Sequence, residues 1–223
     1  MTKESSAYDM ILLPIKRIVL VSLVVTILAI WFSSEPSIVG CSSANSDTSI
    51  TIENQIEKLA VLYEDSWNRV SEDEKLEILQ IVADLEQQHL GIYHRLPVKV
   101  EDGLSCQGYY SDNYKSIGVN QDCLENEDPF TLVSLIAHEA YHAYEYRLVD
   151  ALKMVSDDIQ ELNIFKQAEE YRNCFVHYIK AEVDYEGYFN QKVEEDSREY
   201  AFKRTVFYFK SIYQYLGIEY AAG

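Results

Sequence analysis

The stretch SLIAHEAYHAYEYR, residues 134–147, contains three side chains whose types and spacing suit metal chemistry. Residues four apart lie on the same face of an α-helix, so His138 and His142 can present two imidazoles to one metal ion. Imidazole is a common ligand of Zn²⁺ in proteins. Glu139 lies about 100° around the helix from His138, where its carboxylate can take a proton from a water that zinc has acidified. The spacing therefore predicts a hydrolytic zinc site with Glu139 as general base.

The residues around this motif indicate that it lies on a buried helix. Asp128 and Pro129 form an N-cap followed by proline at the first helical position, so we expect the helix to begin at about Pro129. The segment FTLVSLIA is apolar on nearly every face, and Ala140 and Ala143 continue it with small side chains. Two histidines and a glutamate in a buried helix need partners. Either a metal ion or hydrogen bonds among the side chains would provide them.

With this H-E-x-x-H motif the chain resembles the zincins, the superfamily of zinc metallopeptidases named for it. The segment GYYSDNYKSIGVN is similar to the strand, turn and strand that precede the motif helix in many small zincins. The resemblance implies one Zn²⁺ per chain and hydrolysis of peptide bonds in a peptide or protein substrate. It also implies an edge strand above the zinc helix that pairs with extended substrate. Ile117 to Asn120 is the candidate, and an ordinary hairpin is the alternative.

The residues after the motif indicate which branch of the zincins the chain resembles. Metzincins carry Gly and His three and six residues after the second motif histidine, where this chain has Glu145 and Leu148. Gluzincins instead take a glutamate from a downstream helix. The segment YFNQKVEEDSREYAF, residues 188–202, is similar to the E-x-[DE]-A-x-x-x-A segment of several gluzincin families. This similarity implies that Glu194 is the third metal ligand.

Four residues of the downstream segment fall on the family pattern: Glu194, Asp196, Ser197 and Ala201. Ser197 replaces the usual first alanine. Ser197 and Ala201 follow Glu194 by three and seven residues, so they keep its face of the helix small and allow the zinc helix to approach closely. Glu195 and Glu182 remain rival ligands.

Hydrophobic periodicity and turn residues predict the remaining elements. In chain order these are a helix over 52–70, a helix opened by a capping box at 71–74 and ended at 91, strands at 97–100 and on both sides of a polar turn within 106–123, and long, tyrosine-rich helices over 157–190 and 192–215. The predicted fold is α+β and mainly helical. It is a zincin-like domain with a small sheet, preceded by one N-terminal membrane helix.

The N-terminal segment predicts a membrane connection. IVLVSLVVTILAIWF, residues 18–32, carries no charge and follows Lys16 and Arg17. A helix of this length spans about 22 Å, short of the ~30 Å hydrocarbon core, but the apolar residues before Lys16 can lengthen it if the two basic side chains snorkel. The positive flank predicts that the N-terminal side is cytoplasmic. A retained signal anchor, a cleaved signal peptide and a lipoprotein signal ending at Cys41 remain open.

These observations predict three parts in the chain. Residues 1–33 are a cytoplasmic tip and transmembrane anchor or signal segment, 34–50 a linker, and 51–223 the zincin-like metallopeptidase domain. All three interpretations of the N-terminal segment place the domain outside the cytoplasmic membrane. Two of them leave it attached to the cell membrane, either by a single pass or by a lipid.

Charge and cysteine content constrain the partners and the cross-links. The net charge of −18 would repel phosphate backbones, so nucleic acid is not expected as a partner. The 4 cysteines form no C-x-x-C pair, which argues against a cysteine-only zinc site. Cys106 and Cys123 bracket the predicted hairpin. They are expected to form a disulfide outside the cytoplasm, and two free buried thiols are the alternative.

The sequence thus predicts a membrane-anchored, extracytoplasmic zinc metallopeptidase with His138, His142 and Glu194 as metal ligands and Glu139 as general base. Two alternatives are a non-catalytic membrane-anchored binding protein on the same scaffold and a hydrolase of cell-wall peptides. A tyrosine near the site is expected to stabilise the developing oxyanion, but the 18 tyrosines leave open which one.

Overall fold

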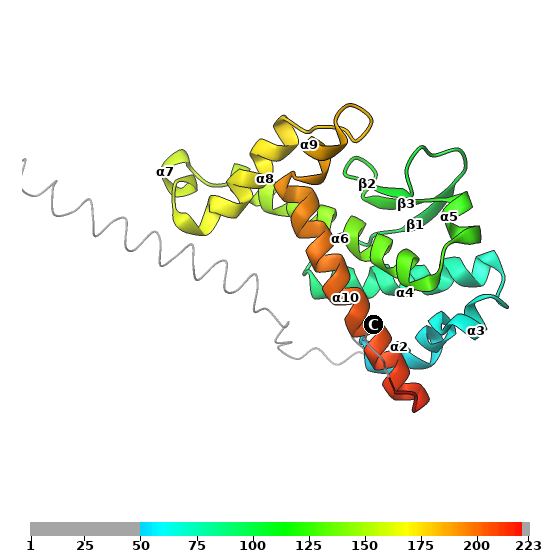
Figure 1. The fold of residues 1–223 in the computed structure, drawn as a ribbon. Helices are drawn as coiled ribbons and strands as arrows, with labels where there is room; N and C mark the ends of the chain where they lie inside the picture. Colours follow the sequence, from blue (N-terminus) through cyan, green and yellow to red (C-terminus); the bar gives the residue numbers. More distant parts are fainter. Residues whose placement is uncertain (1–49, 220–223) are drawn as a thin grey trace, which may run out of the picture. The chain divides into compact units, whose positions relative to one another are not determined.

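The computed structural model describes residues 50–219. Within them, most elements are helices, and one small sheet of three strands lies to one side of them (Figure 1). This architecture confirms the mainly helical α+β fold class. The predicted membrane segment and Cys41 lie outside the described residues. Within residues 50–219, none of the helices combines the length and the apolar composition that a membrane crossing requires.

Two long helices, α6 and α10, pack directly against each other, and the shorter elements lie around them (Figure 1). The helical elements are α2 (Ile52–Leu59), η1 (Ala60–Leu62), α3 (Glu64–Trp67), α4 (Glu72–His89), α5 (Gln121–Asn126), α6 (Pro129–Lys153), α7 (Asp157–Gln160), η2 (Asn163–Phe165), α8 (Lys166–Val176), α9 (Tyr185–Phe189) and α10 (Lys192–Leu216). The strands are β1 (Val98–Glu101), β2 (Gly108–Ser111) and β3 (Ser116–Asn120).

Helix α6 carries the H-E-x-x-H motif and begins where the sequence predicts. Asp128 is its N-cap, and the carboxylate accepts a hydrogen bond from the backbone N–H of Thr131 at 3.0 Å. Pro129 takes the first helical position, where the missing N–H leaves no partner unsatisfied. Leu132 and Ile136 are completely buried. The helix therefore passes through the core.

Small side chains on α10 let it lie close to α6, as predicted. Ser197, Ala201 and Thr205 follow one another at intervals of four residues and are 0%, 1% and 0% exposed. They form a narrow strip along the face of α10 that packs against α6. This close approach is what brings the first turn of α10 next to the motif.

The sheet has the strand order β1-β3-β2, with β1 parallel and β2 antiparallel to the central strand. The predicted hairpin is therefore formed, but the prediction that Ile117 to Asn120 is the edge strand is wrong. Those residues belong to β3, whose two sides pair with Val98–Glu101 and with Gly108–Ser111. Strand β2 is the edge that packs against α6.

Gly108 explains how β2 can lie so near α6. A Cβ atom at this position would stand 2.7 Å from the backbone oxygen of Gly118 and 3.1 Å from the methyl carbons of Leu135 on α6. Such distances are below van der Waals contact, so only glycine fits without moving the strand.

The helix predicted over 52–70 is broken into α2, η1 and α3. Tyr63 adopts an extended conformation between them. On one straight helix Leu62 and Trp67 would lie about 140° apart. With the bend, both are buried, at 0% and 1% exposure. Burial of two large side chains thus overrides the helical periodicity.

The helix predicted over 157–190 is also interrupted, at Leu162 and again between α8 and α9. In the second interruption the Gln191 side chain binds both backbone groups of Ile179. It accepts from the N–H at 2.8 Å and donates to the carbonyl at 2.9 Å. These bonds replace the helical partners of Ile179, so residues 177–184 form a loop. The predicted helix over 192–215 is confirmed as α10.

A second buried polar cluster joins α4 to α10. Glu86 is 0% exposed and accepts hydrogen bonds from Arg204 at 2.8 Å, from the Tyr208 hydroxyl at 2.6 Å and from the Tyr200 hydroxyl. Both carboxylate oxygens are therefore satisfied. The cluster holds the middle of α10 against α4.

Candidate metal centre

His138 and His142 face each other across one turn of α6. Their Nε2 atoms are 3.0 Å apart, and the two rings meet edge to face with centroids 4.6 Å apart. The spacing of four residues thus brings the two imidazoles together, as the sequence predicts.

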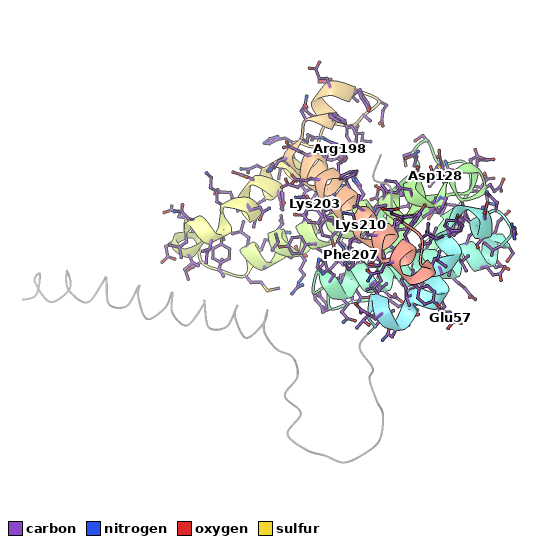
Figure 2. All side chains as sticks on the ribbon, turned by 60° about the horizontal axis from the view of Figure 1, so that its bottom comes forward. Glu57, Asp128, Arg198, Lys203, Phe207 and Lys210 are labelled. Carbon is purple, nitrogen blue, oxygen red and sulfur yellow. The ribbon has the colours of Figure 1, made fainter. Side chains whose placement is uncertain are left out.

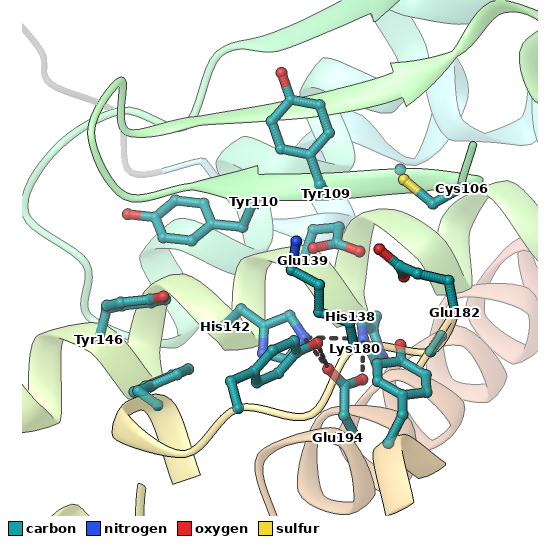
Figure 3. A pocket seen from close by; sticks show the side chains of 15 residues that line it. Cys106, Tyr109, Tyr110, His138, Glu139, His142, Tyr146, Lys180, Glu182 and Glu194 are labelled. Carbon is teal, nitrogen blue, oxygen red and sulfur yellow. Dashed lines mark hydrogen bonds and ion pairs between the residues drawn. The ribbon is translucent and has the colours of Figure 1, made fainter. Parts of the chain in front are cut away.

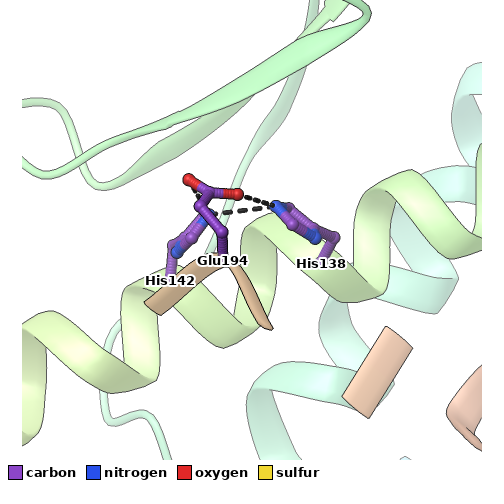
Figure 4. A group of neighbouring side chains, drawn as sticks. All are labelled: His138, His142 and Glu194. Carbon is purple, nitrogen blue, oxygen red and sulfur yellow. Dashed lines mark hydrogen bonds and ion pairs between the residues drawn. The ribbon is translucent and has the colours of Figure 1, made fainter. Parts of the chain in front are cut away.

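Glu194, in the first turn of α10, completes a group of three (Figure 4). Its Oε2 atom is 3.4 Å from Nε2 of His138, and its Oε1 atom is 3.6 Å from Nε2 of His142. The side chain is 1% exposed. The candidate ligand atoms of the three residues all lie within 4.8 Å of one another. Two histidines and one glutamate, 52 residues further along the chain than the second histidine, therefore form a cluster that could hold a metal ion.

The two rival glutamates do not join this cluster. Glu195 is exposed, and its carboxylate lies 3.9 Å from Nζ of Lys192. Glu182 is exposed on the loop 177–184 and lines the cavity in front of the cluster. Among the residues that the structure describes, His138, His142 and Glu194 are the one group of three such side chains close enough to share an ion.

The geometry and the chemistry of the three residues both fit zinc. In tetrahedral sites with metal–ligand distances of about 2.0–2.1 Å, neighbouring ligand atoms lie about 3.3 Å apart. The two Nε2 atoms lie 3.0 Å apart, and they lie 3.4 and 3.6 Å from different oxygens of Glu194, while one ligand atom from each residue gives separations within 4.8 Å. Oε2 of Glu194 is buried with no hydrogen-bond partner, and Nε2 of His138 lies 3.4 Å from it, so a cation beside this oxygen would be stabilised. Two imidazoles and a carboxylate are also a common ligand set of catalytic zinc.

The charges around the histidines favour a cation. Glu139, Glu145 and Glu194 are all buried, at 6%, 0% and 1% exposure. Burial lowers the pKa of His142, but the hydrogen bond and charge of Glu145 raise it more, to about 9. Burial raises the pKa of Glu194, yet His138, His142 and a hydrogen bond from Tyr178 bring it down to about 2. The carboxylates outnumber the imidazoles, so positive charge is stabilised here, whether as protons or as a metal ion.

Glu145, which in the sequence is notable only as a departure from the metzincin pattern, lies buried against His142. One of its oxygens is 2.8 Å from Nδ1 of His142, and the other is buried without a hydrogen-bond partner. A proton on Nδ1 that is donated to Glu145 leaves the Nε2 lone pair of His142 directed at the cluster. Ser197 lies 3.2 Å from the same Nδ1 atom and donates to the carbonyl of Val193. The i, i+3 spacing of His142 and Glu145 was the available sequence signal.

Glu139 lies beside the cluster, at the point where two cavities meet. One cavity of about 420 Å³ and another of about 410 Å³ both have His138 and Glu139 in their lining. Cys106, Gly108 and Tyr188 also line both. Figure 3 shows Glu139 on α6 below strand β2, with Glu194 on the side of α10. The two cavities form one cleft that crosses the candidate metal centre beneath the edge strand.

Two tyrosines that the sequence could not single out stand at the cluster. The hydroxyl of Tyr178 donates a hydrogen bond of 2.6 Å to Oε1 of Glu194. Tyr188 lies beside it, with ring centroids 6.3 Å apart, and both line the cleft. Burial and the nearby Glu194 raise the pKa of both hydroxyls well above the usual value, so both remain protonated donors. Tyr178 lies on the loop that the Gln191 bonds hold in place.

The predicted disulfide is not formed, since Cys106 and Cys123 are both free thiols. Cys106 is exposed and lines the cleft beside Glu139. Cys123, in α5, packs against the hydrophobic core. The bracketing positions in the sequence therefore do not lead to a bridge, because one thiol faces the cleft and the other faces the core.

Comparisons with protein-family models, with curated proteins and with solved structures give no match for this chain. The geometry of the site is therefore the basis for assigning a function.

Proposed function

We propose that the protein is a zinc-dependent metallopeptidase that hydrolyses peptide bonds. The observation that carries this proposal is the cluster of His138, His142 and Glu194, with the carboxylate of Glu139 beside it where two cavities meet. His138, His142 and Glu194 would hold one zinc ion. When bound, zinc would polarise the substrate carbonyl and make a water molecule more acidic.

In this proposal Glu139 moves the protons. Its carboxylate accepts a proton from the attacking water as the water oxygen adds to the carbonyl carbon. It then delivers that proton to the amine nitrogen as the C–N bond breaks. Glu139 is 6% exposed, so little solvent competes for the proton. Glu145 would hold the His142 ring in orientation. The hydroxyl of Tyr188, or that of Tyr178 once it exchanges its hydrogen bond to Glu194, would donate to the carbonyl oxygen.

Extended substrate would bind along β2. The strand pairs with β3 on one side, and its other edge runs beside the cleft. Unpaired backbone groups on such an edge can hydrogen-bond an extended peptide. This assignment transfers the role expected of an edge strand from Ile117–Asn120 to Gly108–Ser111.

The cellular setting is proposed from the sequence. The uncharged segment 18–32 after Lys16 and Arg17 would anchor the protein in the cell membrane or direct its export, with the domain from residue 51 extracytoplasmic. Its partners would be peptides or proteins. The net charge of −18 argues against nucleic acid.

A Glu139→Gln variant tests the proposal. Glutamine keeps the shape of the side chain but cannot accept the water's proton, so cleavage of a broad peptide library should fall about 10²–10⁴-fold. Zinc content should stay close to that of the wild type, because Glu139 is not a ligand. Glu195→Gln, an exposed neighbour of the third ligand, is the matched control and should retain full activity.

Equal rates for the wild type and Glu139→Gln would eliminate Glu139 as the base. A zinc-loaded wild type that cleaves neither peptides nor cell-wall peptides would favour the non-catalytic binding protein.

A further inference from the structure

The two halves of the cleft differ in charge. The half that reaches toward His142 is lined by Lys180 and Glu182, two exposed side chains of opposite sign on the loop 177–184. The other half extends toward the N-terminal part of α6. Among its described lining residues, the one permanent cation is Arg198. In a chain with 37 acidic and 19 basic residues, an arginine that shares a cavity with Glu139 and forms no ion pair needs an explanation.

Arg198 is held in place without a carboxylate partner. Its guanidinium donates to the backbone carbonyl of Phe189 at the end of α9 and stacks on the Phe189 ring, 3.8 Å from the centroid. Within residues 50–219, no acidic side chain forms an ion pair with it, whereas Arg204 on the same helix pairs with Glu86. A guanidinium has five N–H donors, so several remain for a ligand. Fixing it beforehand lowers the entropy cost of binding.

The rest of this half-cleft suits the stem of a side chain. Phe130 and Leu135, both on α6, supply apolar surface, and the Ser134 hydroxyl and the Gln107 amide also line it. A volume of about 410 Å³ is large enough for an amino-acid side chain. Arg198 lies one helical turn after Glu194 on α10. Because Glu194 would bind the zinc at which the bond is cleaved, a group bound to Arg198 would lie within a residue or two of that bond.

We propose that this half of the cleft, lined by Phe130, Leu135 and Arg198, is a subsite that binds a carboxylate of the substrate. The carboxylate belongs either to an acidic side chain or to the C-terminus of a short peptide. Bidentate pairing with Arg198 would offset its repulsion from Glu139 and would orient the substrate across the cleft. This inference rests on the proposed peptidase function, because it specifies the substrate of the same site.

The test uses the full chain loaded with zinc. A peptide that the wild type cleaves is selected from a library, and mass spectrometry locates the bond. One series of peptides then carries Glu, Gln or Lys at each of the two positions on either side of that bond. A second series ends at one of the two positions after the bond, with the C-terminus either free or amidated. A charge-assisted hydrogen-bond pair is worth about 10- to 100-fold. Glu should therefore exceed Gln in kcat/KM by that factor at one position, or free acid should exceed amide if the terminus is bound.

Arg198→Gln should bring this ratio down to about 1. Lys203→Gln removes one positive charge from the same helix at an exposed position, paired with Glu199, and should keep the ratio (Figure 2 labels both Arg198 and Lys203). Arg198→Glu should reverse the preference and favour Lys over Gln, a gain that misfolding cannot produce. Equal rates for the acidic and neutral peptides at every position would overturn the proposal, as would an unchanged ratio in Arg198→Gln.

Calorimetric binding of the same peptide pairs to the zinc-loaded chain separates this inference from the proposed function. Tighter binding of the carboxylate peptide that Arg198→Gln abolishes would support the subsite even if no peptide is cleaved. Equal binding of the acidic and neutral peptides would refute it.

Discussion

Two buried glutamates on neighbouring helices have opposite surroundings, and the difference separates a cluster that protein atoms complete from one that could hold a metal ion. Glu86 accepts from Arg204, Tyr200 and Tyr208, so both of its oxygens are satisfied. Glu194 is just as buried, but its Oε2 has no hydrogen-bond partner, and its nearest neighbours are two histidines. A buried polar atom without a partner points to strain, a functional role or a bound water or ion. The Glu86 cluster is complete with protein atoms alone, whereas the Glu194 cluster could hold a metal ion.

The largest expected effect is on stability, and it comes from a substitution in the Glu86 cluster. Glu86→Gln would leave the Arg204 charge buried without its counter-ion, and the free energy of unfolding should fall by about 3–5 kcal/mol. Glu77→Gln is the matched control, because Glu77 is exposed on the same helix α4, and it should change stability by no more than about 0.5 kcal/mol. Urea denaturation of the three proteins gives these values. A loss for Glu86→Gln as small as the control's would mean that the cluster does not hold α10 to α4.

Glu194→Ala should lower the affinity of the chain for zinc. Binding of structural zinc is worth about 10–16 kcal/mol over four ligands, so one ligand contributes roughly 3 kcal/mol, or about 100-fold in affinity. Glu195→Ala should leave the zinc affinity unchanged. Competition with a chelator measures both. If Glu195→Ala were the damaging substitution, the third ligand would have to be reassigned.

A smaller effect on metal affinity is expected from Glu145, which contacts a proposed ligand without being one. Glu145→Gln keeps a hydrogen-bonding side chain beside Nδ1 of His142 but removes the charge that orients and polarises the ring. Such partners typically contribute 10- to 100-fold to metal affinity. The same chelator competition measures it, with Glu125→Gln, exposed on α5, as the control. An affinity equal to that of the wild type would show that Glu145 only fills space.

Local patterns predicted the parts of the site that a single helix determines. The four-residue spacing of His138 and His142, and the cap at Asp128 and Pro129, depend on neighbours within one or two turns. The strip of small residues beside Glu194 also follows from helical periodicity. The structure retains these features because the helix faces that carry them are also buried.

The features that the sequence did not predict depend on contacts between distant segments. Strand β3 became central because β1 pairs with its far side in parallel, which no local pattern specifies. The loop 177–184 exists because Gln191 binds the backbone of Ile179. The Tyr178 donor at Glu194 could be found only once that loop was placed. Cys106 and Cys123 flank a real hairpin, but their thiols face different surroundings.

The most direct test of the central claim is the X-ray absorption spectrum of the full chain at the zinc edge. We expect about one zinc per chain with imidazole nitrogens and oxygens at about 2.0–2.1 Å, and loss of the imidazole scattering when His138 and His142 are both replaced by alanine. A sulfur shell at about 2.3 Å would contradict it, because the metal would then be bound by a thiol such as Cys106. An unchanged spectrum in the double variant would place the metal elsewhere.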